Sequence, residues 1–119
     1  MLNKLLSLSL ISLMLSPIAV QAHHTSGQKA SWYGRDYHGR RMANGQIYNM
    51  YSDSCAHKTY RFGTRLRVTN LNNGRSTTCV VRDRGPFIKG RVVDLSLQGA
   101  RNLNMVRAGV VPVSIQVIR

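Results

Sequence analysis

The sequence predicts an all-β domain, most economically a small closed barrel of five or six strands with one or two short helices. Short segments of alternating or β-branched residues, separated by turn residues, recur from residue 29 to the end of the chain. No long amphipathic helix is present to cover a sheet. Closure would remove the exposed edges that so small a domain cannot protect. An open sandwich is the alternative, because periodicity alone does not distinguish the two.

Residues 1–22 predict a secretory signal. Lys4 supplies the positive start, residues 5–15 form an apolar run too short to span a bilayer, and the small-residue cleavage site ends at Ala22. No cysteine that could accept a lipid follows. We therefore expect cleavage after Ala22 and export to the periplasm or cell wall without a lipid or transmembrane anchor. The polar residues 23–28 predict a flexible leader.

The first half of the domain, which we place at residues 29–119, begins with a predicted strand at 29–33. Residues 34–51 are rich in Gly, Asn, Arg and Tyr without a sustained period, which predicts long surface loops. Residues 64–71 then alternate, and a turn at Asn72-Asn73-Gly74 leads into a second strand at 76–83. These two strands predict a hairpin.

The last part of the chain predicts two more strands with a helix between them. Residues 91–95 form a short strand, and Ser96 can cap a helix from Leu97 to Asn104. Residues 110–118 alternate as a final strand. Pro112 indicates that this strand begins at a sheet edge, because proline cannot donate a ladder hydrogen bond.

Charge and carboxylate content restrict the chemistry. The chain has 17 basic and four acidic residues, and removal of residues 1–22 leaves a formal charge of +12. Such a domain attracts polyanions, and export favours anionic lipid or the carboxylates of the cell wall over nucleic acid, which we do not expect as a partner. There is no glutamate, so a mechanism with two carboxylates on opposite sides of a bond has few ways to assemble. The four acids are Asp36, Asp53, Asp83 and Asp94.

Cys55 and Cys79 are the only cysteines, and in an exported chain they predict one disulfide. Closing a loop of about 25 residues contributes roughly 3.5 kcal/mol in the chain-entropy model. A nucleophilic cysteine is the weaker alternative, because no Cys-x-x-Cys pair is present. The four histidines lack ligand spacing, so we expect neither a metal site nor a cofactor.

Ordered short motifs cover nearly all of the predicted domain. They are Ala30-Ser31-Trp32-Tyr33-Gly34, His38-Gly39-Arg40-Arg41, Ala43-Asn44-Gly45, Ala56-His57-Lys58-Thr59, Phe62-Gly63-Thr64, Val68-Thr69-Asn70, Asn73-Gly74-Arg75, Asp83-Arg84-Gly85-Pro86, Gly90-Arg91 and Asp94-Leu95-Ser96. Together, in this order and spacing, they resemble the rare lipoprotein A (RlpA) family. The resemblance implies a six-stranded double-psi β-barrel related to expansins and barwin-like proteins, and lytic transglycosylation of peptidoglycan as the reaction.

The reaction implied by the resemblance suits a chain with few carboxylates. The 6-hydroxyl of N-acetylmuramic acid attacks its own anomeric carbon, the bond to N-acetylglucosamine breaks, and a 1,6-anhydro end remains. One carboxyl group can then serve as both acid and base. Family position implies that Asp83 has this role and that His57 orients it or binds the substrate. The alternative for Asp83 is a turn residue that caps backbone amides. If Asp83 lies on a strand, alternation predicts that Arg82 and Arg84 point to the opposite face.

Five residues are expected to bind substrate. Tyr33 and Tyr48 offer rings on which sugars can pack, although in a small barrel either could be core. Asn44, Gln46 and Arg84 supply hydrogen-bond donors and acceptors. Gln46 departs from the family, whose active members usually carry glutamate there. An amide cannot titrate, so the departure weakens or removes activity if that position must be charged.

Three classes of function follow. The first is an endolytic transglycosylase with Asp83 and His57, acting as a monomer on glycan strands; no division-site partner is assigned. The second is a non-catalytic, expansin-like peptidoglycan-binding protein, which Gln46 and the charge favour. The third is a secreted effector or inhibitor, which rests on fold analogy alone.

Overall fold

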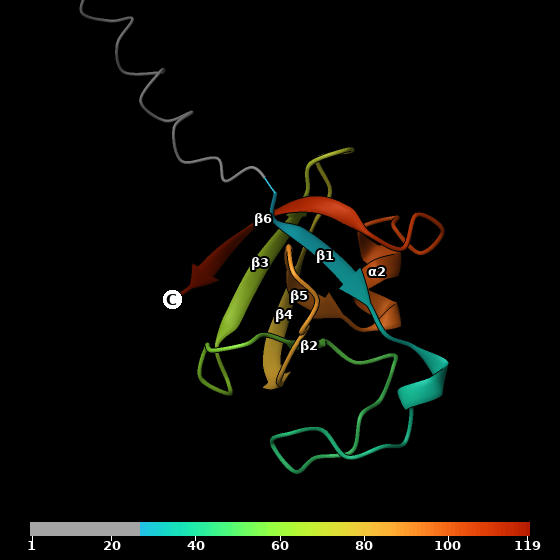
Figure 1. Cartoon of the computed structure of the whole chain (residues 1–119), viewed down its shortest axis with the longest axis vertical. Coiled ribbons are helices and arrows are strands. Elements are labelled where there is room, and N and C mark those ends of the chain that lie inside the picture. Colours follow the sequence, from blue (N-terminus) through green and yellow to red (C-terminus); the bar gives the residue numbers. More distant parts are fainter. Residues whose placement is uncertain (1–26) are drawn as a thin grey trace, which may run out of the picture.

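A computed structural model describes residues 27–119; the predicted signal and most of the leader lie outside the described residues. Six strands form one closed barrel in the order β1-β5-β2-β4-β3-β6 (Figure 1), which confirms the predicted barrel and excludes the open sandwich. The elements are β1 (Lys29–Trp32), the 3-10 helix η2 (Arg35–Tyr37), β2 (Ser54–Ala56), β3 (Arg65–Asn70), β4 (Ser76–Asp83), β5 (Arg91–Leu95), α2 (Leu97–Asn102) and β6 (Val111–Ile118).

The barrel mixes parallel and antiparallel neighbours. β1 lies parallel to β5 and β2 lies parallel to β4, whereas the remaining pairs are antiparallel. The predicted hairpin is β3–β4, with the register from Arg65↔Val80 to Thr69↔Ser76. The parallel pairs bring segments that are distant in sequence side by side, and no local pattern in the sequence specifies them.

Three details differ from the sequence prediction. β2 was not predicted, because its three residues are all buried and show no alternation. β6 has a neighbour on each side, and Pro112 pairs with Lys29 of β1, so the proposed edge position is wrong; the β1–β6 ladder is only two residue pairs long. Helix α2 ends at Asn102 rather than Asn104, although Ser96 does cap it by accepting from the amide of Gly99. Among residues 27–119, no helix is long and apolar enough to cross a membrane.

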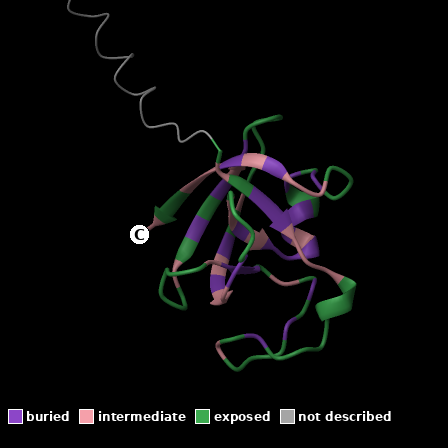
Figure 2. Cartoon of the chain, in the orientation of Figure 1, coloured by how far each residue is buried: buried purple, intermediate pink, exposed green. Residues whose placement is uncertain are grey.

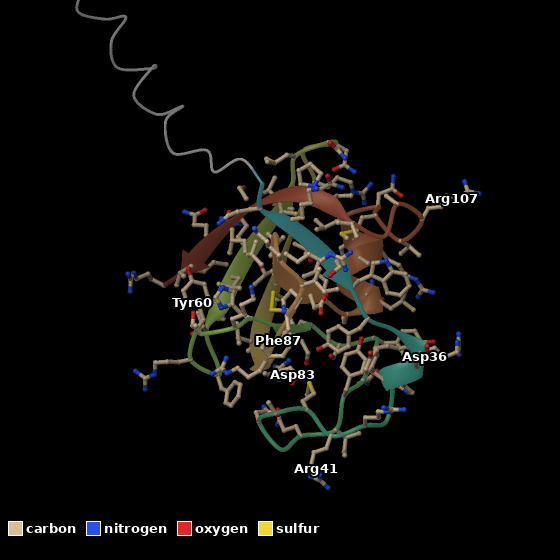
Figure 3. All side chains as sticks on the ribbon, viewed as in Figure 1. Asp36, Arg41, Tyr60, Asp83, Phe87 and Arg107 are labelled. Atoms are coloured by element: carbon tan, nitrogen blue, oxygen red, sulfur yellow. A yellow bond between two sulfur atoms is a disulfide. The ribbon has the colours of Figure 1, made fainter. Side chains whose placement is uncertain are left out.

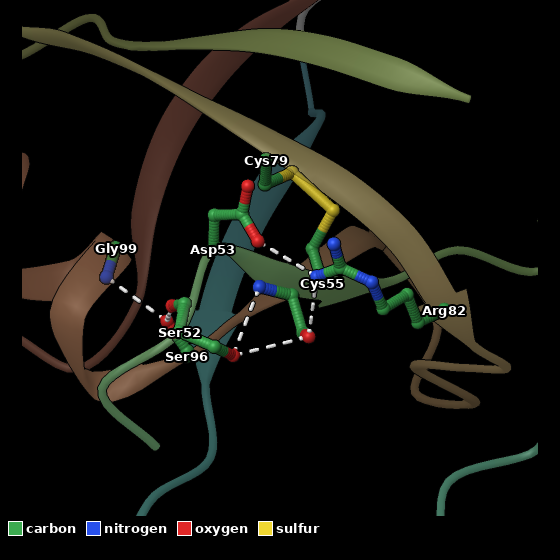
Figure 4. Close-up of a disulfide and its surroundings, with 8 residues drawn as sticks. Ser52, Asp53, Cys55, Cys79, Arg82, Ser96 and Gly99 are labelled. Carbon is green, nitrogen blue, oxygen red and sulfur yellow. Dashed lines mark hydrogen bonds and ion pairs between the residues drawn. A yellow bond between two sulfur atoms is a disulfide. The ribbon is translucent and has the colours of Figure 1, made fainter. Parts of the chain in front are cut away.

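Two apolar clusters stabilise the fold. Figure 2 shows that the strands of the barrel alternate between buried and less buried positions. The larger fills the barrel, and each of its fully buried Val, Leu and Met side chains contributes about 1.5–3 kcal/mol. It includes the predicted disulfide, Cys55–Cys79 (Figure 4). The smaller cluster attaches the long loop after β1 to the barrel. Its members are Met42, Tyr48, Met50 and Leu97, with Trp32 and Tyr33 packed against them.

Candidate active site

A cavity of about 660 Å³ lies between the barrel and the loop that follows β1. Strand residues form its floor, and the segments 33–42 and 84–88 form its walls. Figure 3 shows Asp83 and Phe87 on the barrel side of this space, and Asp36 and Arg41 on the loop side. The cavity therefore combines a rigid floor with walls made by loops.

The cavity floor contains one row of residues that crosses four strands. Ser31 of β1 pairs with Asp94 of β5, Asp94 pairs with Ala56 of β2, and Ala56 pairs with Asp83 of β4. Residues opposite one another on neighbouring strands present their side chains on the same face, and all four line the cavity. Two strand spacings of about 4.8 Å place the two aspartate backbones roughly 10 Å apart. Ala56 is the residue between them in this row.

Asp83 ends β4 and holds two backbone amides. Its Oδ1 accepts from the amide of Ala43 at 2.9 Å and from the amide of Arg84 at 2.9 Å. The bond from Ala43 fastens the loop wall to the cavity floor. The capping role considered as an alternative to catalysis is therefore present, and it coexists with a position inside the cavity.

Asp94 is a carboxyl of the cavity floor to which the sequence analysis assigned no role. The hydroxyl of Ser31 donates to its Oδ1. Burial raises the pKa of Asp94, and the charge of Asp83 adds to this rise, whereas the Ser31 bond and the charge of Arg91 oppose it. In the sequence, only the position of Asp94 in a family motif pointed to this residue. The row that joins Asp94 to Asp83 depends on strand pairings that local sequence patterns do not specify.

The two predicted aromatic ligands take different positions. Tyr48 is 2% exposed, donates its hydroxyl to the Tyr33 carbonyl at 2.6 Å, and lies in the smaller core cluster. The ring of Tyr33 stacks on Tyr48 at 4.4 Å and meets the edge of Tyr37 at 5.7 Å. These contacts occupy the ring of Tyr33, a residue that lines the cavity.

The Tyr33 hydroxyl is buried and has no hydrogen-bond partner among residues 27–119. Burial raises the pKa of Tyr33, and the charges of Asp83 and Asp94 raise it further. Burial also raises the pKa of Tyr48, to about 12. Both phenols are therefore donors at neutral pH, and that of Tyr33 lies within electrostatic reach of both floor carboxyls.

His57 follows β2 but is not among the described residues that line the cavity. Its Nδ1 accepts from the amides of Thr59 and Tyr60, each at 3.1 Å, and its ring stacks on Tyr60 at 4.0 Å. Burial lowers the pKa of His57, and the charges of Arg84 and Lys58 lower it further. These bonds favour a neutral imidazole with its proton on Nε2, which is a hydrogen-bond donor rather than a base.

Asn44 and Gln46 also lie outside the cavity lining. The Asn44 amide donates to Gln46 Oε1 at 2.8 Å, and Asn44 Oδ1 accepts from the Gln46 backbone at 2.9 Å. Gln46 lines a second, smaller hollow of about 260 Å³. The backbone amide of His57 donates to the Asp83 carbonyl at 3.2 Å, so this segment adjoins the cavity floor although its side chain is outside the lining. The roles expected for Asn44, Gln46 and His57 stay predictions.

The two arginines beside Asp83 diverge. Arg82 forms an ion pair with Asp53 at 2.7 Å, away from the cavity, as alternation predicted. Arg84 follows the end of β4 and is among the residues that line the cavity, but the contacts of its guanidinium are with residues outside that lining. The Arg84 guanidinium lies 4.1 Å from the ring centre of Phe62 and donates to the backbone carbonyls of His57 and Tyr60.

Comparison with known proteins agrees with this geometry. The model of the lytic transglycolase family matches residues 25–115. The chain belongs to this family. Its RlpA-like domain is 49% identical over 94 residues to the endolytic peptidoglycan transglycosylase RlpA of Vibrio cholerae, covering 79% of this chain and 36% of that protein. It is 44% identical over 102 residues to RlpA of Campylobacter jejuni, covering 86% of this chain and 37% of that protein.

Solved structures support the double-psi β-barrel fold. The Streptomyces papain inhibitor superposes with a TM-score of 0.62 at 24% identity, covering 76% of this chain and 91% of that one. A Clavibacter michiganensis expansin gives 0.59 at 24% identity, covering 77% and 49%. The RlpA-like domain spans just over a third of these two curated relatives. Within residues 27–119, no three His, Cys, Asp or Glu side chains are grouped as metal ligands.

Proposed function

We propose that this domain is an exported, monomeric endolytic transglycosylase that cleaves the bond between N-acetylmuramic acid and N-acetylglucosamine and leaves 1,6-anhydro ends. One observation carries the proposal: in a member of the lytic transglycolase family, an open cavity contains Asp83 at its floor, where a glycan strand can reach it. The names of the V. cholerae and C. jejuni relatives support the same substrate class.

The proposed chemistry requires little from the protein. The nucleophile, the 6-hydroxyl, belongs to the substrate, so the protein must hold the sugar, donate a proton to the leaving oxygen and remove one from the hydroxyl. Asp83 is in position for proton transfer because its Oδ1 bonds hold the carboxyl still. The buried hydroxyl of Tyr33 is a donor without a protein partner, which suits a hydrogen bond to the bound sugar.

The walls of the cavity suit a strand of anionic polymer. Five arginines line the cavity and outnumber its three aspartates, and they attract the carboxylates of the wall. Phe87, on the 84–88 wall, is 80% exposed and offers a flat apolar surface for a sugar ring. The five arginines are Arg35, Arg40, Arg41, Arg84 and Arg91.

The test is mass spectrometry of soluble products released from insoluble peptidoglycan, both intact and stripped of stem peptides. The purified domain should release fragments ending in 1,6-anhydro-N-acetylmuramic acid, and Asp83→Asn should abolish their release. The asparagine retains an oxygen that can accept from Ala43 and Arg84, so the loop stays attached while the acid is lost. Undiminished release by the variant contradicts the role of Asp83, and reducing ends in place of anhydro ends identify hydrolysis.

A second candidate is a non-catalytic, expansin-like wall binder. Gln46 favours it, because an amide stands where active relatives usually carry a carboxylate, and so does the formal charge of +12 that the chain keeps without its signal. This candidate predicts that the protein pellets with peptidoglycan, that salt strongly weakens the binding, and that no soluble fragment appears even at high protein concentration.

A further inference from the structure

We propose that Asp94 is a second catalytic carboxyl, which protonates the leaving oxygen while Asp83 accepts the proton of the attacking 6-hydroxyl. This inference rests on the proposed function and divides its chemistry between two residues. The resemblance to the RlpA family implied one carboxyl for both tasks. Three of the chain's four aspartates line the same cavity, and two of them, Asp83 and Asp94, lie on its strand floor.

The row across the cavity floor gives the two carboxyls a shared reaction space. Asp94 and Asp83 lie on β5 and β4, and both pair with Ala56 of the strand between them. Their backbones are roughly 10 Å apart, from two strand spacings. Side chains that extend from the same face of strands at this spacing can enclose the reacting sugar atoms between them. The small side chain of Ala56 keeps that space open, so the sugar hydroxyl can reach it.

The surroundings of the two carboxyls assign the roles. Burial and the charge of Asp83 raise the pKa of Asp94, and the bond from Ser31 and the charge of Arg91 do not cancel the rise. Asp94 therefore retains a proton to higher pH than an ordinary aspartate, as an acid must. Asp83 directs one oxygen to the amides of Ala43 and Arg84, which positions it as the acceptor.

The proton transfers balance over one turnover. Asp94 gives its proton to the oxygen of N-acetylglucosamine as the bond from that oxygen to the anomeric carbon breaks. The 6-hydroxyl oxygen bonds to the same carbon and loses its proton to Asp83. The site then holds one proton on Asp83 and none on Asp94, and transfer of that proton to Asp94 restores the starting state. No water or other reactant is consumed.

The experiment compares product release by the wild-type domain, Asp94→Asn and Asp83→Asn on stripped peptidoglycan, with Asp53→Asn as a control that removes a carboxylate outside the cavity. Because asparagine can still accept from Ser31, Asp94→Asn should fold normally, which circular dichroism checks. We expect both cavity variants to lose activity by about 100-fold or more, the scale of general acid–base catalysis, and the control to keep it.

A carboxyl-carbon NMR titration separates a catalytic pair from a structural role. In the wild type, Asp94 should titrate above the usual range for aspartate, and Asp83→Asn should lower its midpoint by removing a neighbouring negative charge. An Asp94 midpoint that Asp83→Asn leaves unchanged would overturn the pairing.

The amount of product released distinguishes failure of the role of Asp94 from failure of the proposed function. Fragments from both the wild type and Asp94→Asn, in similar amounts, overturn the role of Asp94 and leave the proposed function standing. No fragments from the wild type overturn both. Ala56→Val adds a further check, because it fills the space between two intact carboxyls: release should fall sharply while the folded structure persists, and unchanged release contradicts the shared reaction space.

Discussion

The Cys55–Cys79 disulfide should provide a large share of the stability of this domain. It joins β2 to β4 across 24 positions of sequence, and both cysteines are buried in the main core. The chain-entropy model gives roughly 3.5 kcal/mol for a closed loop of this length. A domain of this size has a free energy of unfolding of about 5–15 kcal/mol. Reduction should therefore remove a quarter or more of it.

The assay is thermal and urea unfolding of the wild-type domain, each monitored by circular dichroism with and without a strong reductant. Reduction changes no other side chain, so the difference reports the cross-link. The thermal midpoint should fall by roughly 14–28 °C, from 4–8 °C per kcal/mol in small domains. Cys55→Ala and Cys79→Ala should each lose about as much as the double variant, because either substitution removes the whole bridge. A reduced protein with an unfolding free energy within about 1 kcal/mol of the oxidised one refutes this reasoning.

Three further predictions concern the site. Tyr33→Phe keeps the stacked ring and removes a buried hydroxyl without a partner, so stability in urea should not fall. Product release should drop about tenfold or more, which corresponds to about 1.4 kcal/mol in the activation free energy. Equal release by the variant and the wild type excludes the hydroxyl as a ligand. His57 should titrate below its usual pKa by NMR, and its contribution to stability should be lost as pH falls below about 6.5, a loss absent from His57→Gln. Because Gln46 lies outside the cavity lining, Gln46→Glu should change product release by less than about tenfold, and a larger gain places its loop at the cleavage point.

Much of the fold could be predicted because its strands have local signals. The β3–β4 hairpin has alternation and an Asn-Gly turn, and the Ser96 cap marks the start of α2. β2 has none of these signals. Its three residues are small and buried, and neighbours far along the chain hold it in place rather than its own propensity. A strand fixed only by tertiary contacts cannot be identified from periodicity.

The missing local signal for β2 also explains why the site was only partly predicted. Asp83 and His57 were selected from motif positions, which say nothing about direction: the Nδ1 of His57 is turned toward its own loop, and Asp83 faces the cavity. Asp94 could not be connected to Asp83, because the connection passes through β2. Tyr48 was considered either a ligand or core, and the choice depended on the loop's packing against Met42 and Leu97.

The position of β2 gives a physical reason why so few carboxylates can suffice. A chain with four acids can form a pair only if the fold brings two of them together. One short strand between β5 and β4 does this, and it contributes Ala56, whose small side chain separates the carboxyls without filling the space. Cys55 adjoins Ala56, and its bridge to β4 fastens the strand on the Asp83 side. Breaking that bridge should therefore reduce catalysis at urea concentrations where the barrel is still folded, because the spacing of the two acids depends on β2.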